Sequence, residues 1–175
     1  MKETYIRFMA PVLPITIDTL MRIIDQKIAN KYDRVNLLIS SPGGSVFHGL
    51  SVYNFLKGAP IEVCTFNFGS VDSIGVVIYC AGSKRYCVPH ARFLIHGVKM
   101  TVVGQNNFDE FQMQENLKSL QIDQKNIARV IADTTGKPSD IIEKDMHDRK
   151  TLNPSEAKDY GLVHVIESRL FPLNA

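Results

Sequence analysis

Three short segments of the chain carry the residue types that could do chemistry. Ser41–Gly44 reads SPGG, Gly69–Gly75 contains Ser73 between glycines, and Leu94–His96 ends on a histidine. Acyl transfer to serine requires a nucleophilic hydroxyl, a base that removes its proton, and backbone N–H donors for the oxyanion. The order of a glycine turn, a serine and a later histidine therefore indicates a serine acyl-transfer site.

The glycines and the serine each have a physical reason to serve in such a site. Gly43 and Gly44 carry no Cβ, so their backbone N–H groups can approach a substrate closely. Ser73 opens a predicted helix, whose N-terminal dipole favours a developing anion, and Ile74 could give a second donor. His96 ends a predicted strand, where its ring could face the mouth of the site.

The elements that must position these residues alternate along the chain. Apolar runs and helical spacing predict strands at 35–40, 61–66, 85–88 and 92–96, and helices at 16–29, 50–58 and 74–80. Strands that alternate with helices favour an α/β fold with right-handed crossovers. The segments that carry the chemistry then follow the strands directly.

The second half of the chain predicts a different kind of element. A polar, Gln-rich and glycine-free stretch at about 107–133 predicts a long helix that projects from the core. Asn153, Pro154 and Glu156 form the pattern of a helix start, and Gly161 ends that helix before a predicted strand at 162–166. The length of 175 residues predicts one domain over 1–175.

Composition and charge exclude several classes of function. The formal net charge is +2 and no basic stripe is present, so a nucleic-acid partner is not expected. No apolar run has the length of a membrane span, and no signal-peptide core is seen, which predicts a cytoplasmic protein without membrane association. Cys64, Cys80 and Cys87 predict reduced core cysteines, and neither a metal nor an organic cofactor is expected.

Each motif on its own also has an ordinary structural interpretation. An isolated SPGG sequence is more often a plain turn, and a serine near glycines is usually a helix cap. A histidine at the end of a strand is usually a surface residue. The spacing alone therefore leaves the function open.

The chain as a whole resembles the ClpP family, the proteolytic subunits of the Clp protease within the crotonase-like superfamily. The resemblance extends from about Tyr5 to Ile166 and rests on an ordered set of motifs: Leu37–Gly44, Gly69–Gly75, Ala81–Pro89, Arg92–His96 and Glu156–Val163. It implies a repeated ββα superhelix with a projecting handle helix, here at about 107–133. It also implies a serine endopeptidase that acts on unfolded proteins or short peptides.

The resemblance further implies roles for single residues and an assembly. Ser73 is expected as the nucleophile, His96 as the general base, and the amides of Gly44 and Ile74 as the oxyanion hole. The family forms ring homo-oligomers, so a heptamer or stacked heptamers are expected. The family's N-terminal gating segment has no counterpart in the sequence given, which leaves dependence on a Clp-type ATPase open.

Three places depart from the family pattern, one of them Gly97-Val98, which replaces the usual Gln-Pro after the histidine and bears on the substrate groove. Arg149 stands where the family has the third triad member, an Asp; a one-residue shift would bring Asp148 into that place, and Asp145 lies further back. The alternative for Asp148 is a solvated loop charge. Asp72 precedes the nucleophile where a small apolar residue is usual, and its carboxylate either disturbs the oxyanion or points away.

These departures keep two other functions open beside the peptidase. A non-catalytic ring subunit is favoured by Arg149 and Asp72. An acyl-CoA enzyme of the wider superfamily is disfavoured, because oxyanion holes there work without a serine and histidine such as Ser73 and His96.

Overall fold

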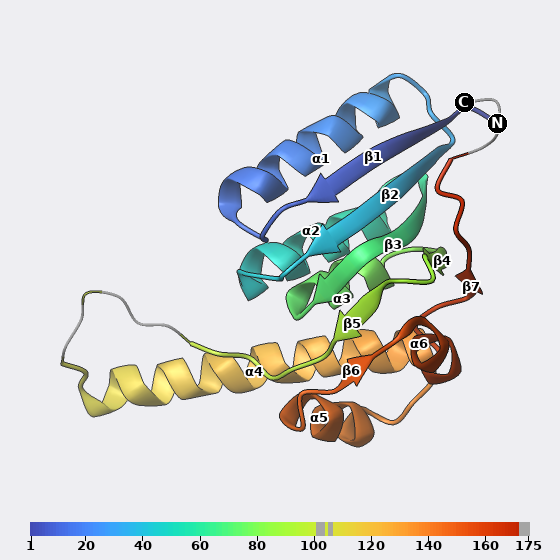
Figure 1. The fold of residues 1–175 in the computed structure, drawn as a ribbon. Coiled ribbons are helices and arrows are strands. Elements are labelled where there is room, and N and C mark those ends of the chain that lie inside the picture. Colours follow the sequence, from blue (N-terminus) through green and yellow to red (C-terminus); the bar gives the residue numbers. More distant parts are fainter. Residues whose placement is uncertain (101–103, 105–106, 172–175) are drawn as a thin grey trace.

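A mixed α/β fold built on a parallel sheet is seen in the computed structural model, which describes residues 1–100, 104 and 107–171 (Figure 1). In chain order the elements are β1 (Glu3–Met9), α1 (Pro14–Ala29), β2 (Arg34–Ser41), α2 (Val46–Gly58), β3 (Glu62–Asp72), α3 (Ile74–Cys80), β4 (Lys84–Cys87), β5 (Arg92–Leu94), α4 (Glu110–Thr135), α5 (Ser139–His147), β6 (Thr151–Leu152), α6 (Pro154–Tyr160) and β7 (Val165–Ile166). The α/β architecture predicted from the sequence is confirmed.

The long strand β3 organises the sheet around the carboxyl ends of its strands. The strand order is β1-β2-β3-β4-β7, all parallel, while β5 pairs with β3 and with the antiparallel β6. The first half of β3 pairs with β4, and its second half pairs with β5, with Asp72 opposite Leu94. Residues that follow β3 and β5 therefore emerge side by side, at the edge where parallel sheets place their ligand sites.

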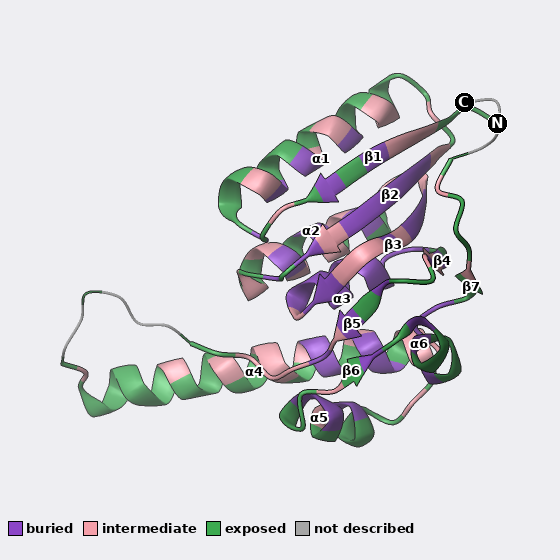
Figure 2. Ribbon diagram, viewed as in Figure 1, coloured by how far each residue is buried: buried purple, intermediate pink, exposed green. Residues whose placement is uncertain are grey.

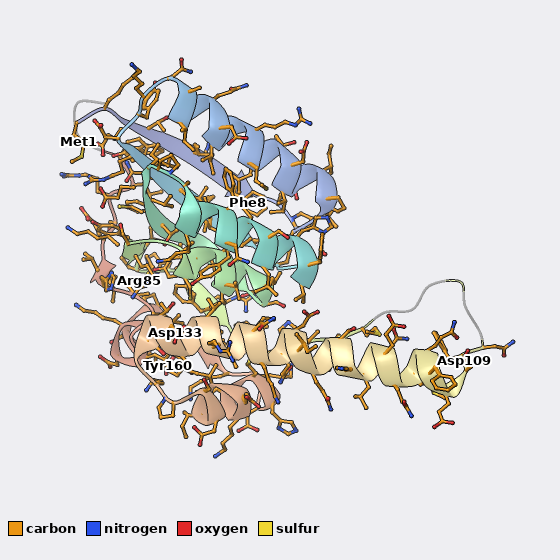
Figure 3. All side chains as sticks on the ribbon, turned by 180° about the vertical axis from the view of Figure 1, so that it is seen from behind. Met1, Phe8, Arg85, Asp109, Asp133 and Tyr160 are labelled. Carbon is orange, nitrogen blue, oxygen red and sulfur yellow. The ribbon has the colours of Figure 1, made fainter. Side chains whose placement is uncertain are left out.

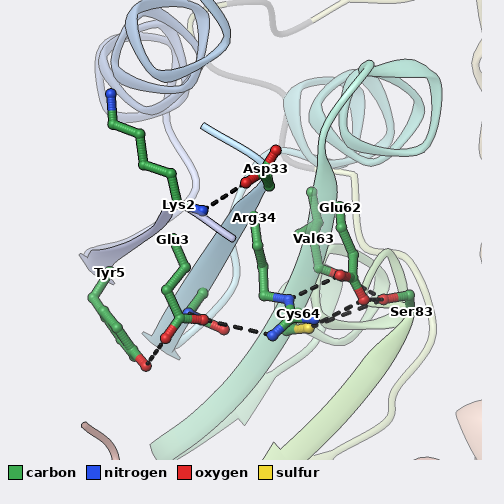
Figure 4. Close-up of polar contacts among 10 residues, drawn as sticks. Lys2, Glu3, Tyr5, Asp33, Arg34, Glu62, Val63, Cys64 and Ser83 are labelled. Carbon is green, nitrogen blue, oxygen red and sulfur yellow. Dashed lines mark hydrogen bonds and ion pairs between the residues drawn. The ribbon is translucent and has the colours of Figure 1, made fainter. Parts of the chain in front are cut away.

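Charged residues fix the register at the opposite, amino-terminal ends of the strands (Figure 4). Arg34 of β2 is opposite Glu3 of β1 on one side and opposite Glu62 of β3 on the other. Its guanidinium contacts Glu62 at 2.8 Å and Glu3 at 3.5 Å. Opposite charges across strands stabilise a given pairing by about 0.2–1 kcal/mol each. These pairs hold the register of the amino-terminal halves of the strands. Between β2 and β3 the register shifts after Ile39, so that Ser41 is opposite Val71.

The helices supply the apolar faces that the sheet needs. In α1 the buried side chains are Ile17, Leu20 and Ile24, which share one face, and all seven residues of α3 are buried. Figure 2 shows this burial as purple on the strands and on α3. The helix predicted at 16–29 begins two residues earlier, because Pro14 fits the first helical position.

The predicted projecting helix is α4, which runs from Glu110 to Thr135 rather than over 107–133. Asp109 caps its start by accepting from the Gln112 N–H at 2.8 Å, and Gly136 ends it with φ of 73°. Only the last part of α4 packs on the core, and Figure 3 places Asp109 at the distant tip and Asp133 near the body. No helix within the described ranges combines the length and apolar character needed to cross a bilayer.

The C-terminal predictions are confirmed in part. Asn153 caps α6 and Glu156 completes the capping box, with Pro154 at the first helical position and Gly161 at the end. The strand predicted at 162–166 is limited to Val165–Ile166. Leu162 and Val163 are buried in the turn that follows Gly161 and lie outside the strand.

The three cysteines are free and buried, as the sequence predicted. Burial raises the pKa of Cys80 and of Cys87 to about 11. A thiol with so high a pKa is almost entirely protonated at neutral pH and therefore a poor nucleophile.

Arg85 joins the C-terminal segment to the sheet. Its buried guanidinium donates to the carbonyls of Leu162 at 2.7 Å and Gly82 at 3.2 Å. The Arg85 main-chain N–H donates to His164 Nδ1 at 3.1 Å, and the guanidinium lies 2.8 Å from Nε2 of the same ring. Burial and this positive charge lower the pKa of His164 below its ordinary value.

Acid is expected to destabilise the fold through His164. Because the pKa of His164 is lowered in the folded state, the unfolded chain binds this proton first, so stability is full above pH 6.5 and falls as the pH drops below it. Thermal unfolding measured above and below that pH gives the slope of stability against pH. His164→Asn should flatten it, whereas His147→Asn, whose ring contacts Asp148 and not Arg85, should not. Equal slopes in all three proteins would contradict the assignment.

Candidate active site

Ser73 lies in the turn between β3 and α3 with a backbone that few residues adopt. Its φ of 57° and ψ of −130° lie outside the regions favoured by L-residues. The Ser73 N–H donates to the Leu94 carbonyl at 2.8 Å, which holds the turn against the end of β5. A non-glycine residue in such a conformation costs about 1–3 kcal/mol and is typical of functional sites.

The glycine turn after β2 packs directly against Ser73. A Cβ added at Gly43 would lie 2.6 Å from the Ser73 Cβ, and one at Gly44 would lie 2.3 Å from the Val12 carbonyl oxygen. Both glycines also have positive φ, 87° and 148°. Glycine is therefore required at both positions, for space and for conformation.

His96 reaches the same place from β5. A pocket of about 80 Å³ is lined by Ser73, His96, Gly44 and Ile74, with further walls from Val46, Gly97, Val98, Lys99 and Ile127. The structure thus brings together four of the five residues predicted for the site. They come from the connections that follow β2, β3 and β5. Because β3 pairs with β5, the connections that carry Ser73 and His96 lie side by side.

The backbone N–H groups of the two predicted oxyanion donors, Gly44 and Ile74, are not used in the local secondary structure. Ile74 is the first residue of α3, and the first N–H groups of a helix have no acceptor within it. The bridge between Gly44 and Val12 uses the Gly43 carbonyl and the Ser45 N–H, so it leaves the Gly44 N–H out of the pairing. Two amides beside a serine hydroxyl are the arrangement that stabilises an oxyanion.

Asp148, the fifth predicted residue, is not brought to His96. It is the C-cap of α5, its side chain is 55% exposed, and Oδ1 lies 3.1 Å from His147 Nδ1. Arg149 follows with φ of 56°, and the Lys150 N–H closes the helix on the Asp145 carbonyl. This is a Schellman ending, normally made by glycine, and it lies just before β6. The role of Asp148 stays a prediction.

Asp145 is held in a different contact. Its carboxylate accepts from Lys150 Nζ at 2.8 Å and from the Tyr160 hydroxyl at 2.6 Å. Burial alone would raise the pKa of Asp145, but these hydrogen bonds outweigh burial and hold the pKa below its ordinary value. The same contact and burial raise the pKa of Tyr160. Asp145 therefore joins α5 to α6.

The Asp72 carboxylate points away from the nucleophile. Its two oxygens accept from the Ser70 hydroxyl at 2.8 Å and from Arg92 Nη2 at 2.7 Å. Ser70 and Arg92 are opposite each other in the β3–β5 pairing. Asp72, two residues after Ser70, lies on the same face of β3 as Ser70. Of the two alternatives drawn from the sequence, the structure shows the one in which the Asp72 carboxylate points away and does not disturb the oxyanion.

Sequence reasoning missed the residues that complete the pocket and support the histidine. Val46, Val98 and Ile127 form its apolar walls, and Gln124 of α4 accepts from the Val98 N–H at 3.0 Å. The only signal in the sequence was the apolar Ile127 within the polar stretch of α4. Among the residues with described placement, no group of three or more His, Cys, Asp and Glu side chains is arranged to hold a metal ion.

Comparison with known proteins gives a consistent set of relatives. Residues 14–169 match the family model described as Clp protease. The ATP-dependent Clp protease proteolytic subunit 2 of Corynebacterium diphtheriae is 33% identical over 143 residues, which are 80% of this chain and 70% of that protein. The ATP-dependent Clp protease proteolytic subunit of Bdellovibrio bacteriovorus is 32% identical over 149 residues, 82% of this chain and 68% of that protein.

The solved structures agree on the fold. A mutant of ClpP1 from Listeria monocytogenes matches with a TM-score of 0.85, over 94% of this chain and 91% of that chain. The sequence identity between the two is 24%, so this likeness concerns the arrangement of the elements.

Proposed function

The chain belongs to the Clp protease family, and from that premise we propose that it is a serine endopeptidase acting on unfolded proteins or short peptides. Family membership supports the peptidase role. The observation that carries the serine mechanism is the single pocket shared by Ser73, His96, Gly44 and Ile74. A nucleophile, a base and two amide donors at one pocket match the needs of acyl transfer.

The proposed reaction proceeds in two halves. Ser73 Oγ attacks the scissile carbonyl carbon while His96 Nε2 takes the hydroxyl proton, and the Gly44 and Ile74 amides hold the oxyanion. The C–N bond then breaks, and His96 passes its proton to the leaving amine. Water, deprotonated by His96, attacks the acyl-enzyme, releases the carboxylic acid and returns the proton to Ser73.

The walls of the pocket bear on which side chain enters it. Val46, Val98 and Ile127 present apolar surface beside the nucleophile. Burying apolar area against these three side chains is favourable by about 25 cal/mol per Å², so an apolar substrate residue next to the scissile bond would gain affinity from this part of the wall.

We also propose that the chain assembles into a homo-oligomeric ring, a heptamer or stacked heptamers. The support is α4, whose projecting part exposes large apolar side chains: Phe111, Met113, Leu117 and Ile122. Exposed apolar surface of this kind marks protein contacts. The relatives named above are subunits of ATP-dependent proteases, which makes a Clp-type ATPase a candidate partner.

One observation favours a second function, that of a non-catalytic ring subunit. Arg149 occupies the position expected for the third triad residue, and Asp148 is turned toward His147. A peptidase whose histidine lacks any orienting group loses about 10⁴ in turnover.

An assay with the purified assembly separates the two functions. The chain is incubated with short fluorogenic peptides and with an unfolded polypeptide, while its assembly mass is measured in parallel. Hydrolysis of the short peptides without any ATPase is the expected result. An assembled ring that cleaves neither substrate, alone or with a Clp-type ATPase, would support the non-catalytic subunit instead.

A further inference from the structure

The imidazole of His96 already has an orienting partner in this structure. Its Nδ1 lies 2.7 Å from the carbonyl oxygen of Gly97. A carbonyl oxygen can only accept a hydrogen bond, so Nδ1 must carry the proton in this contact. In the neutral ring Nε2 then keeps its lone pair, and this is the tautomer that a general base for Ser73 requires.

The main chain that carries this carbonyl is anchored on both sides. The Ile95 N–H donates to the Lys150 carbonyl at 2.8 Å, and the Gly97 N–H donates to the Met146 carbonyl at 2.9 Å. The third anchor is a side chain: Gln124 Oε1 on α4 accepts from the Val98 N–H at 3.0 Å. This anchor can be removed by substitution.

Gln124 also packs against Gly97 itself. A Cβ added at Gly97 would lie 3.3 Å from Gln124 Oε1, which is closer than nearly all such contacts. The side chain of Gln124 therefore limits both the position of the Val98 N–H and the space around Gly97. Together these contacts fix the peptide group whose carbonyl faces His96.

The two carboxylates that the sequence offers near the third triad position are engaged elsewhere. Asp148 contacts His147 at the surface, and Asp145 is bound by Lys150 and Tyr160. The Gly97 carbonyl is thus the partner that the structure gives to Nδ1.

We propose that the main-chain carbonyl of Gly97 orients His96 in place of a carboxylate, and that Gln124 is the positioning residue that holds this carbonyl. The inference rests on the proposed function, because it assigns how the base of that reaction is held. A neutral carbonyl fixes the tautomer and the ring direction without adding negative charge.

The test combines a spectrum of the ring with the rate of labelling by a fluorophosphonate probe. The protein is prepared with ¹⁵N-histidine, and the His96 signals are assigned from their loss in His96→Gln. Gln124→Met removes the acceptor at similar size, Gln124→Glu keeps an acceptor oxygen, and Gln121→Met is the control on the exposed side of α4. Asp148→Ala removes the competing carboxylate, and circular dichroism checks each fold.

The expected spectrum shows Nδ1 protonated and hydrogen-bonded in the wild type and in Asp148→Ala. Gln124→Met should disturb that signal and lower the labelling rate on the order of 10²-fold, the effect of a small misplacement of a catalytic group. Gln124→Glu should restore both readouts, and Gln121→Met should change neither.

Two results would overturn the inference. One is a loss of about 10⁴ in labelling with a changed Nδ1 signal in Asp148→Ala, as removal of a triad carboxylate gives. The other is a folded Gln124→Met that matches the wild type in both readouts. If Gln124→Met fails to fold, the Nδ1 signal and labelling rate of Asp148→Ala and Gln124→Glu still decide whether the inference holds. A wild type with the expected Nδ1 signal but no labelling would contradict the proposed function alone.

Discussion

Replacing Ser73 by alanine is expected to abolish peptide hydrolysis, with a fall in kcat on the order of 10⁶, as for the nucleophile of other serine proteases. The hydroxyl is the atom that forms the acyl-enzyme, and no other group in the pocket can replace it. The fold should survive, because the Ser73 contact with Leu94 is made by its main chain. Hydrolysis of a short fluorogenic peptide measures the effect.

The matched control for this prediction is Ser51→Ala. Ser51 is exposed on α2, and its hydroxyl only donates to the Phe47 carbonyl of its own helix. Its activity should equal that of the wild type. Residual hydrolysis in Ser73→Ala that exceeds a small background would assign the activity to another residue or to a contaminant.

Replacing His96 by alanine is expected to cost nearly as much as losing Ser73. A serine hydroxyl is a weak nucleophile unless a base takes its proton, so the two residues act as one unit. The effects of such residues do not add, and the double variant should be no slower than either single variant. His90→Ala, at an exposed position, is the control.

The additivity of the two substitutions is the informative part of this experiment. If the double variant is slower than each single variant by the product of their effects, Ser73 and His96 act independently. The pairing of β3 with β5 would then place them side by side without joining them in one mechanism.

The parts of this molecule that the sequence could predict are those decided by local interactions. The side chains of Asn153 and Glu156 accept from each other's main-chain N–H groups within one turn, and Pro154 fits the first helical position, so the start of α6 was predicted to the residue. The same holds for α3, whose apolar run begins directly after Ser73. The ends of α4 differed by two or three residues, because the cap at Asp109 lies in a stretch without apolar periodicity.

The surroundings of His96 could not be predicted, because long-range contacts decide them. Whether Asp148 or Arg149 faces the histidine depends on one residue of register, and the structure turns Asp148 toward His147 and places Arg149 in a left-handed turn. Arg149 is neither glycine nor asparagine, so the sequence carries no signal for this turn. Gln124 likewise meets Val98 only because α4 packs across the segment that follows β5.

The pairing of Asp72 with Arg92 shows the same limit. The two residues are far apart in sequence and meet because Ser70 and Arg92 are opposite each other in the register of β3 and β5. The sequence predicted a strand at 92–96, but it predicted the other strand only over 61–66, so the end of β3 that pairs with β5 was missed. Without this pairing, a carboxylate beside the nucleophile looked like evidence against catalysis.

Reaction with a fluorophosphonate followed by peptide mass mapping shows whether Ser73 is an activated nucleophile. We expect a single adduct on the peptide that contains Ser73, formed by the assembled wild type and absent from Ser73→Ala. An assembled wild type that stays unlabelled, or an adduct on any other residue, would contradict this role of Ser73.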